Sequence, residues 1–112
     1  MVFGATGDRD TTKRPKMGRV ADDMADIIIL TDDDTYTEDS MQIINMVQEG
    51  ISRNEGDNFY VIPDRSSAIA RAMEIAQPGG LVLLAGKGSE NQMITNDGPI
   101  DWSDRVEVEK YV

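Results

Sequence analysis

Four short apolar runs divide this chain, and polar or glycine-rich sequence bounds each of them. The runs are Val2-Phe3, Ile27 to Leu30, Phe59 to Ile62 and Leu81 to Ala85. Continuous apolar runs of this length are typical of strands that are buried on both faces of a sheet. The pattern predicts four parallel strands. Leu81 to Ala85 is the most hydrophobic, and Val2-Phe3 is so short that we expect this strand to begin earlier in the natural chain.

The segments between these runs carry apolar residues at helical spacing. They predict helices over residues 15–24, 37–51 and 64–76, with Thr37 capping the second and Asp64 or Ser66 capping the third. The residues predicted to face the core are Met17, Val20, Ala21, Met24, Met41, Ile44, Val47, Ile51, Ile69, Ala72, Met73 and Ala76.

The remaining sequence predicts a small appendage. Residues 91–103 mix glycine, proline and asparagine with isolated apolar positions, which favours a hairpin or irregular edge strands, and residues 104–111 favour a short last helix. Alternation of strands and helices indicates an α/β, Rossmann-like fold. We expect a mostly parallel sheet with helices on both faces and an irregular or antiparallel C-terminal edge. Residues 1–112 are predicted to form a single domain.

Composition narrows the possible functions. The chain has no cysteine and no histidine, which removes disulfides, thiolate metal sites and the commonest general base. A net charge of −10 argues against nucleic acid and anionic membranes as partners. The apolar runs are too short to span a bilayer, and the N-terminus has no hydrophobic targeting core, so we expect a cytoplasmic protein.

Three polar clusters follow predicted strands, and the carboxyl ends of parallel strands are where ligands bind. Gly4 to Asp10 offers an arginine fork, Thr31 to Asp34 offers three acids that favour a cation, and Gly86 to Glu90 offers a lysine between glycines. Each cluster can also be an ordinary solvated turn. We expect Arg9, Asp34 and Glu90 to converge in one pocket that suits a zwitterion.

Taken together, these motifs resemble the C-terminal domain of a Mur ligase. The type that adds the third residue of the peptidoglycan stem peptide is the most similar. Residues 2–18 read VFGxxGDRDxxKRPxMG. The later matches, in the same order, are ADIIILT at 25–31, TED at 37–39, DR at 64–65, AGKGxE at 85–90 and DxSDR at 101–105.

The resemblance implies the third domain of an ATP-dependent amide ligase. An N-terminal domain would hold UDP-muramoyl-dipeptide, and a central P-loop domain would hold ATP and Mg²⁺; both lie outside these residues. The carboxylate of the dipeptide would be phosphorylated, and the amine of the incoming amino acid would then attack the acyl phosphate. Alone, this domain is expected to be inactive, with no catalytic residue and no metal ligand of its own.

The resemblance also implies roles for particular residues. Arg9 would grip a carboxylate of the added amino acid, and Gly86 and Glu90 would hold its far amino and carboxyl groups. The segment containing Asp8, Lys13 and Arg14 would face the nucleotide.

One departure from the family pattern bears on the substrate. Diaminopimelate-adding enzymes carry Asp-Asn-Pro-Arg after the second strand, and the aligned residues here are Asp33, Asp34, Thr35 and Tyr36. A second substrate carboxylate would lose its cationic clamp and gain a negative neighbour. We therefore expect Asp33, Asp34 and Tyr36 to line the amino-acid site and to disfavour diaminopimelate relative to lysine or another amino acid.

Two other readings stay open at this point. A receiver-type signalling module also places acids and a lysine at strand ends, with Asp64 as the candidate phosphoacceptor. A stand-alone binding domain descended from such a ligase would have the same sequence features.

Overall fold

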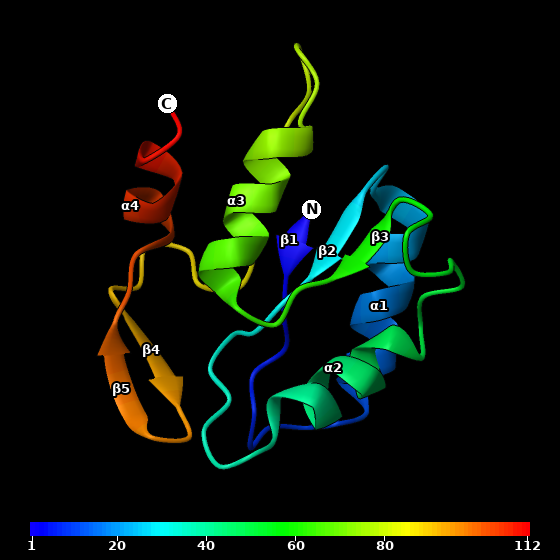
Figure 1. Cartoon of the computed structure of the whole chain (residues 1–112). Coiled ribbons are helices and arrows are strands. Elements are labelled where there is room, and N and C mark those ends of the chain that lie inside the picture. Colours follow the sequence, from blue (N-terminus) through cyan, green and yellow to red (C-terminus); the bar gives the residue numbers. More distant parts are fainter.

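The computed structural model describes all residues, 1–112, and has a three-stranded parallel sheet at its centre (Figure 1). The strands are β1 (Val2–Phe3), β2 (Ile28–Leu30) and β3 (Phe59–Val61), in the order β1-β2-β3. Val2 pairs with Ile29 of β2, and Ile29 in turn pairs with Tyr60 of β3. The sheet confirms the predicted parallel α/β fold.

The predicted fourth strand at Leu81 to Ala85 forms only in part. A single parallel bridge joins Leu84 to Val2, with hydrogen bonds from the Val2 N–H to the Leu83 carbonyl and from the Ala85 N–H to the Val2 carbonyl. Leu81 is 89% exposed, so the expectation of a buried strand is wrong here. This run lies at the open edge of the sheet, where nothing covers its outer side.

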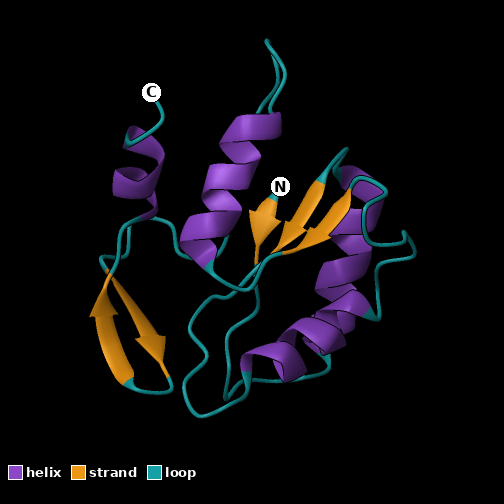
Figure 2. Ribbon diagram, in the orientation of Figure 1, coloured by secondary structure: helices purple, strands orange, loops and turns teal.

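Three helices cover the two faces of the sheet, as Figures 1 and 2 show. They are α1 (Lys13–Met24), α2 (Ser40–Gln48) and α3 (Arg65–Ile75). Ile28 and Leu30 point to the face covered by α1 and α2, whereas Ile29 points to the α3 face, because neighbouring strand residues alternate.

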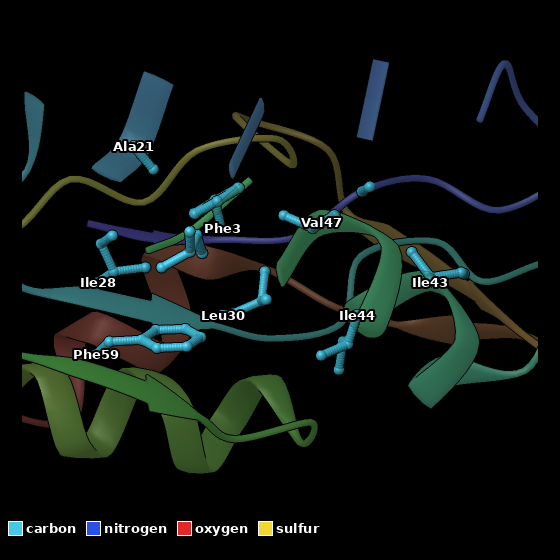
Figure 3. Packing of buried hydrophobic residues seen from close by; sticks show 10 residues of the cluster. Phe3, Ala21, Ile28, Leu30, Ile43, Ile44, Val47 and Phe59 are labelled. Carbon is cyan, nitrogen blue, oxygen red and sulfur yellow. The ribbon is translucent and has the colours of Figure 1, made fainter. Parts of the chain in front are cut away.

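The larger of the two cores lies under α1 and α2, and Figure 3 shows its side chains in contact around β2. Phe59 of β3 and Phe3 of β1 close it from the sheet side, and Ile44 and Val47 of α2 close it from the helix side. The smaller core, under α3, contains Val2, Ile29, Ala68 and Ala72.

The predicted helix faces are only partly right. In α2, Ile44 and Val47 are buried as expected, whereas Met41 is exposed. In α1, the expected core residues Met17, Val20 and Met24 are exposed, and the buried ones are Arg14, Gly18 and Ala21.

The helix caps differ in one case from the prediction. Asp64 caps α3 by accepting a hydrogen bond from the Ser67 N–H, which was one of the two expected caps. The cap of α2 is Asp39, which accepts from the Gln42 N–H, and not Thr37. Thr37 is bonded to Asp8 instead.

The last fifth of the chain forms the predicted appendage. Strands β4 (Gln92–Thr95) and β5 (Gly98–Asp101) pair antiparallel, and α4 (Asp104–Glu109) packs beside α3. Ser103 caps α4 through the Val106 N–H. No helix of the molecule has both the length and the apolar content needed to cross a membrane.

Candidate functional site

The loops that follow β1 and β2 interlock at the carboxyl edge of the sheet. The Gly7 N–H donates to the Asp34 carbonyl at 2.6 Å. Gly7 has no room for a side chain, because a Cβ there would collide with the Thr35 carbonyl. The glycines of the first cluster therefore serve close approach of two backbones, and this approach fixes where Asp8 and Arg9 lie.

A buried ion pair lies beneath the interlocked loops. Arg14 is 1% exposed and makes a two-pronged contact with Glu38, with N–O distances of 2.7 and 2.8 Å. Glu38 also accepts from the Asp8 N–H at 2.7 Å, and the Asp8 carboxylate accepts from Thr37. The hydrogen bonds from Arg14, followed by that from Asp8, lower the pKa of Glu38 to about 2.

Arg9 lies on the surface of this arrangement. Its guanidinium carbon is 5.2 Å from the centre of the Tyr36 ring, a cation–π distance. Asp8 and Tyr36 both have positive φ angles, 54° and 50°, in the left-handed region. The strained turns bring together an exposed guanidinium and an aromatic ring from two different loops.

The third loop contributes a buried lysine. The Lys87 side chain is fully buried, and its Nζ lies 2.8 Å from Asp34 Oδ1, 3.0 Å from Glu90 Oε2 and 3.8 Å from Asp33 Oδ1. Asp34 Oδ1 also accepts from the Ile94 N–H at 2.8 Å, which ties the site to β4. Three carboxylates thus surround one ammonium, so the cluster carries excess negative charge.

Burial and charge act in opposite directions on these groups. Burial raises the pKa of Asp33 above its usual value, although Arg65 and Lys87 partly offset the effect. Burial also raises the pKa of Asp32, which accepts a hydrogen bond from Ser40. Burial alone would lower the pKa of Lys87, but its hydrogen bonds to Asp34 and Glu90 outweigh burial and raise it.

A second buried cation, Arg65, links two of the loops from below. Its guanidinium donates to the Asp32 carbonyl at 3.0 Å and to the Ala85 carbonyl at 3.1 Å. The same group makes a two-pronged pair with Asp104, with both distances 2.9 Å. Arg65 therefore holds the ends of β2 and of the 81–85 run against the start of α4.

The structure brings together only part of the predicted site. Asp33, Asp34, Gly86 and Glu90 form one cluster around Lys87. No ion pair joins Arg9 to this cluster, and Arg9 instead lies over Tyr36.

The predicted nucleotide-facing residues divide in the same way. Lys13 and Asp8 are exposed, while Arg14 is buried against Glu38.

Sequence reasoning missed Lys87 and Arg65 as organising residues and expected the lysine to be exposed at the sheet edge. The sequence does contain a signal that Lys87 is turned inward. Three adjacent acids need a cation, and glycines on both sides of a lysine allow the backbone to turn the side chain inward. Arg65 gave no such signal, because its partners come from three separate segments.

Two cavities of different character occur. A polar one of about 220 Å³ lies beside the acidic loop, and its lining includes Asp32, Asp33, Thr95 and Asp97. An apolar one of about 530 Å³ lies at the opposite end of the strands, between Met24 and Leu81 to Leu83. The apolar cavity is therefore remote from the charged loops.

The site gives no metal-binding geometry. No group of three or more acidic, histidine or cysteine side chains is arranged to hold a metal ion. Lys87 occupies the centre where the carboxylates meet.

Comparison with known proteins gives the family. Residues 1–88 match the family described as "Mur ligase, glutamate ligase domain". The chain is 44% identical over 111 residues to a UDP-N-acetylmuramoyl-L-alanyl-D-glutamate–2,6-diaminopimelate ligase of Clostridium botulinum. The match covers 99% of this chain and 22% of the relative. A UDP-N-acetylmuramyl-tripeptide synthetase of Treponema denticola is 39% identical, with 99% and 21% covered.

A solved structure agrees with the sequence relatives. A structure of UDP-N-acetylmuramoyl-L-alanyl-D-glutamate–2,6-diaminopimelate ligase matches with a TM-score of 0.90 and 43% identity, over 98% of this chain and 22% of that chain. The present chain thus spans about a fifth of the length of the relatives it matches. On this evidence the chain belongs to the Mur ligase family, as its C-terminal domain.

Proposed function

We propose that this chain is the amino-acid-binding domain of an ATP-dependent ligase that adds the third residue to UDP-N-acetylmuramoyl-dipeptide in peptidoglycan synthesis. The observation that carries the proposal is the grouping of Asp34, Lys87 and Glu90 at the carboxyl edge, with the Arg9–Tyr36 pair on the loops that follow β1 and β2 at the same edge. A zwitterionic amino acid needs an acid for its ammonium and a cation for its carboxylate, and this edge offers both.

The solvent exposure of each side chain suggests its role in the proposed site. Glu90 is exposed and its Oε1 makes no hydrogen bond within the protein, so it can accept from a substrate ammonium. Arg9 is exposed and its planar fork suits a carboxylate. Asp34 supports the site from within, because its Oδ1 is already bonded to Lys87 and to the Ile94 N–H.

The reaction would consume ATP, the UDP-linked dipeptide and the amino acid, and would yield ADP, phosphate and the UDP-linked tripeptide. In the complete ligase, ATP would phosphorylate the carboxylate of the dipeptide. This domain would hold the amino acid, whose amine attacks the acyl phosphate and releases phosphate. UDP-sugar, ATP and Mg²⁺ would be held by further domains. Lys13, exposed at the start of α1, and Asp8 are the residues of this chain that remain candidates to face the nucleotide. Arg14, held inside by Glu38, fits a supporting role.

We further propose that the added amino acid lacks a second carboxylate. Tyr36 occupies the position where diaminopimelate-adding members are expected to carry an arginine, and the acids around Lys87 leave excess negative charge. The relatives bear both diaminopimelate-ligase and tripeptide-synthetase names, so their names do not assign one amino acid to this chain. A complete ligase of this kind would work in the cytoplasm, where ATP and UDP-linked precursors occur.

The receiver-type alternative gains no support. Asp64, its candidate phosphoacceptor, caps α3 by accepting hydrogen bonds from both the N–H and the hydroxyl of Ser67. That carboxylate is committed to starting the helix.

Variants of Arg9 test the proposed function in the ligase that carries this domain. Arg9→Ala removes the cation for the substrate carboxylate, and we expect the KM for the amino acid to rise about tenfold or more. Arg9→Lys keeps the charge but loses the planar fork, so its KM for the amino acid should lie between those of the parent and of Arg9→Ala. Arg19→Ala, on the exposed side of α1, is the matched control and should change nothing.

The measurement is ADP release at varied concentrations of lysine, diaminopimelate and a neutral amino acid. The proposal fails if Arg9→Ala leaves the KM of every accepted amino acid unchanged. The substrate proposal alone fails if diaminopimelate is the preferred substrate.

A further inference from the structure

The turn that carries Lys87 is built to direct this side chain inward. Gly86 and Gly88 have φ angles of 103° and 57°, which side-chain-bearing residues adopt rarely, and the Glu90 N–H donates to the Lys87 carbonyl at 3.1 Å. A Cβ at Gly86 would collide with the Asp33 carboxylate. The two glycines therefore allow the backbone to pass over the acids while the lysine between them enters the interior.

Of the three carboxylates around the ammonium, two are hydrogen-bonded to it, one of them buried and the other exposed. Asp34 is buried, whereas the Glu90 side chain is 59% exposed. An exposed glutamate ordinarily samples several rotamers, and holding it in one of them costs entropy. Lys87, fixed by Asp34 at 2.8 Å, restrains Glu90 Oε2 at 3.0 Å and leaves Oε1 without a partner.

We propose that Lys87 is a positioning residue of the amino-acid site, holding Glu90 in the orientation in which its free oxygen accepts the substrate ammonium. This inference rests on the proposed function, because it needs Glu90 to contact the substrate. The Lys87 side chain is fully buried, so it would act on the substrate only through Glu90. The acid cluster then presents one defined carboxylate instead of a diffuse negative charge.

A double-mutant cycle in the ligase that carries this domain tests the inference. Glu90→Gln should raise the KM for the amino acid about tenfold or more, and Lys87→Met should raise it by a comparable factor, with the KM for ATP unchanged in both. If Lys87 acts through Glu90, the double variant should be no worse than Glu90→Gln alone.

Lys87→Met leaves Asp34 buried without its cation and can therefore impair folding. The cycle is repeated in an Asp34→Asn background, where the amide oxygen can still accept from the Ile94 N–H and no buried carboxylate is stranded. Thermal unfolding of each variant identifies losses that come from the fold.

The possible results separate the two proposals. Additive losses from Lys87 and Glu90 in both backgrounds would overturn the positioning role and leave the proposed function standing. A Glu90→Gln variant with an unchanged amino-acid KM would overturn Glu90 as a substrate contact, and the positioning role would fall with it.

Discussion

Three cationic side chains are buried inside this domain and hold its loops through ion pairs. Arg14, Arg65 and Lys87 are each about 1% exposed, and each is paired with at least one carboxylate. Arg14 alone keeps a buried atom, Nε, without a hydrogen-bond partner. Removing the partner of a buried cation leaves an uncompensated charge. Substitution of these residues or of their carboxylate partners should therefore destabilise the domain.

The Arg14–Glu38 pair predicts a definite pH dependence of stability. The pKa of Glu38 falls from 4.5 to about 2 on folding, so its contribution is complete above pH 4.5 and is lost as the pH falls toward 2. Glu38→Gln should lower the free energy of unfolding at pH 7, and its deficit relative to the parent should shrink below pH 4.5.

Denaturant unfolding of both proteins between pH 2 and 7 measures this difference. Asp33, whose pKa is raised by burial, titrates with the opposite sign, but it is present in both proteins and cancels in the comparison. A deficit that stays constant across this range would show that Glu38 is not the titrating group.

At the residue scale, sequence reasoning selected candidates that the structure leaves exposed, but it failed to predict which charged residues are buried. The exposed residues Arg9 and Glu90 were predicted from their motifs. The interior positions of Arg14 and Lys87 were not, because hydrophobic patterning assigns charged residues to the surface. Arg14 left no local signal of its burial, because its partner Glu38 lies 24 residues further along the chain.

Among the elements, α1 shows how close packing overrides hydrophobic spacing. A Cβ at Gly18 would collide with the Val47 carbonyl of α2, and one at Gly50 would collide with the Pro15 carbonyl. The two helices approach through glycine, so the face of α1 that meets α2 is set by small residues. Met17, Val20 and Met24 were predicted to face the core from their spacing and are left outside.

One buried ion pair joins the start of α3 to the start of α4. Arg65, at the start of α3, is paired with Asp104 at the start of α4, and the Trp102 indole N–H donates to the same carboxylate at 2.7 Å. Burial would raise the pKa of Asp104, but these hydrogen bonds outweigh it and lower the pKa.

Breaking this pair should destabilise the domain strongly. Arg65→Met strands the Asp104 carboxylate and removes the donors to the Asp32 and Ala85 carbonyls, which should cost about 3–5 kcal/mol. The exposed pair Arg105–Glu109 supplies the control, because Arg105→Gln should cost about 0.5 kcal/mol or less.

Trp102 is the only tryptophan, so its fluorescence during denaturant unfolding reports directly on this junction. Equal losses of stability in Arg65→Met and Arg105→Gln would contradict the bracing role of Arg65.

For the molecule as a whole, alternation of strands and helices was sufficient to predict the parallel α/β fold, and the glycine, proline and asparagine of residues 91–103 pointed to the hairpin. It was not sufficient to predict the position of the 81–85 run. The most hydrophobic segment was expected to be the most buried, yet it lies at the sheet edge beside an apolar cavity of about 530 Å³. Hydrophobicity indicates that a segment favours burial, but it does not tell whether residues 1–112 include the element that would bury it.

This edge predicts how the chain behaves in solution. The cavity is lined mainly by apolar residues, and Met24 and Leu81 are exposed beside it, so the chain should bind a hydrophobic dye and self-associate as concentration rises. Leu81→Glu should weaken both effects. It should change stability by only about 0.5 kcal/mol, because the side chain is 89% exposed.

Dye fluorescence and light scattering at several concentrations measure this behaviour. Ser89→Glu, an equal charge change at an exposed position beyond the carboxyl end of the same run and away from the cavity lining, is the control. If Ser89→Glu reduces dye binding as much as Leu81→Glu does, net charge and not the apolar edge is responsible.

Our proposal rests above all on Glu90, through which the carboxyl edge of the sheet would bind the amino acid. Its most direct test compares two exposed glutamates in the ligase that carries this domain, by the amino-acid dependence of ADP release. Glu90→Gln should raise the KM for the amino acid about tenfold or more, whereas Glu74→Gln, on the far half of α3, should leave it unchanged. Equal KM values for Glu90→Gln and the parent would contradict the claim.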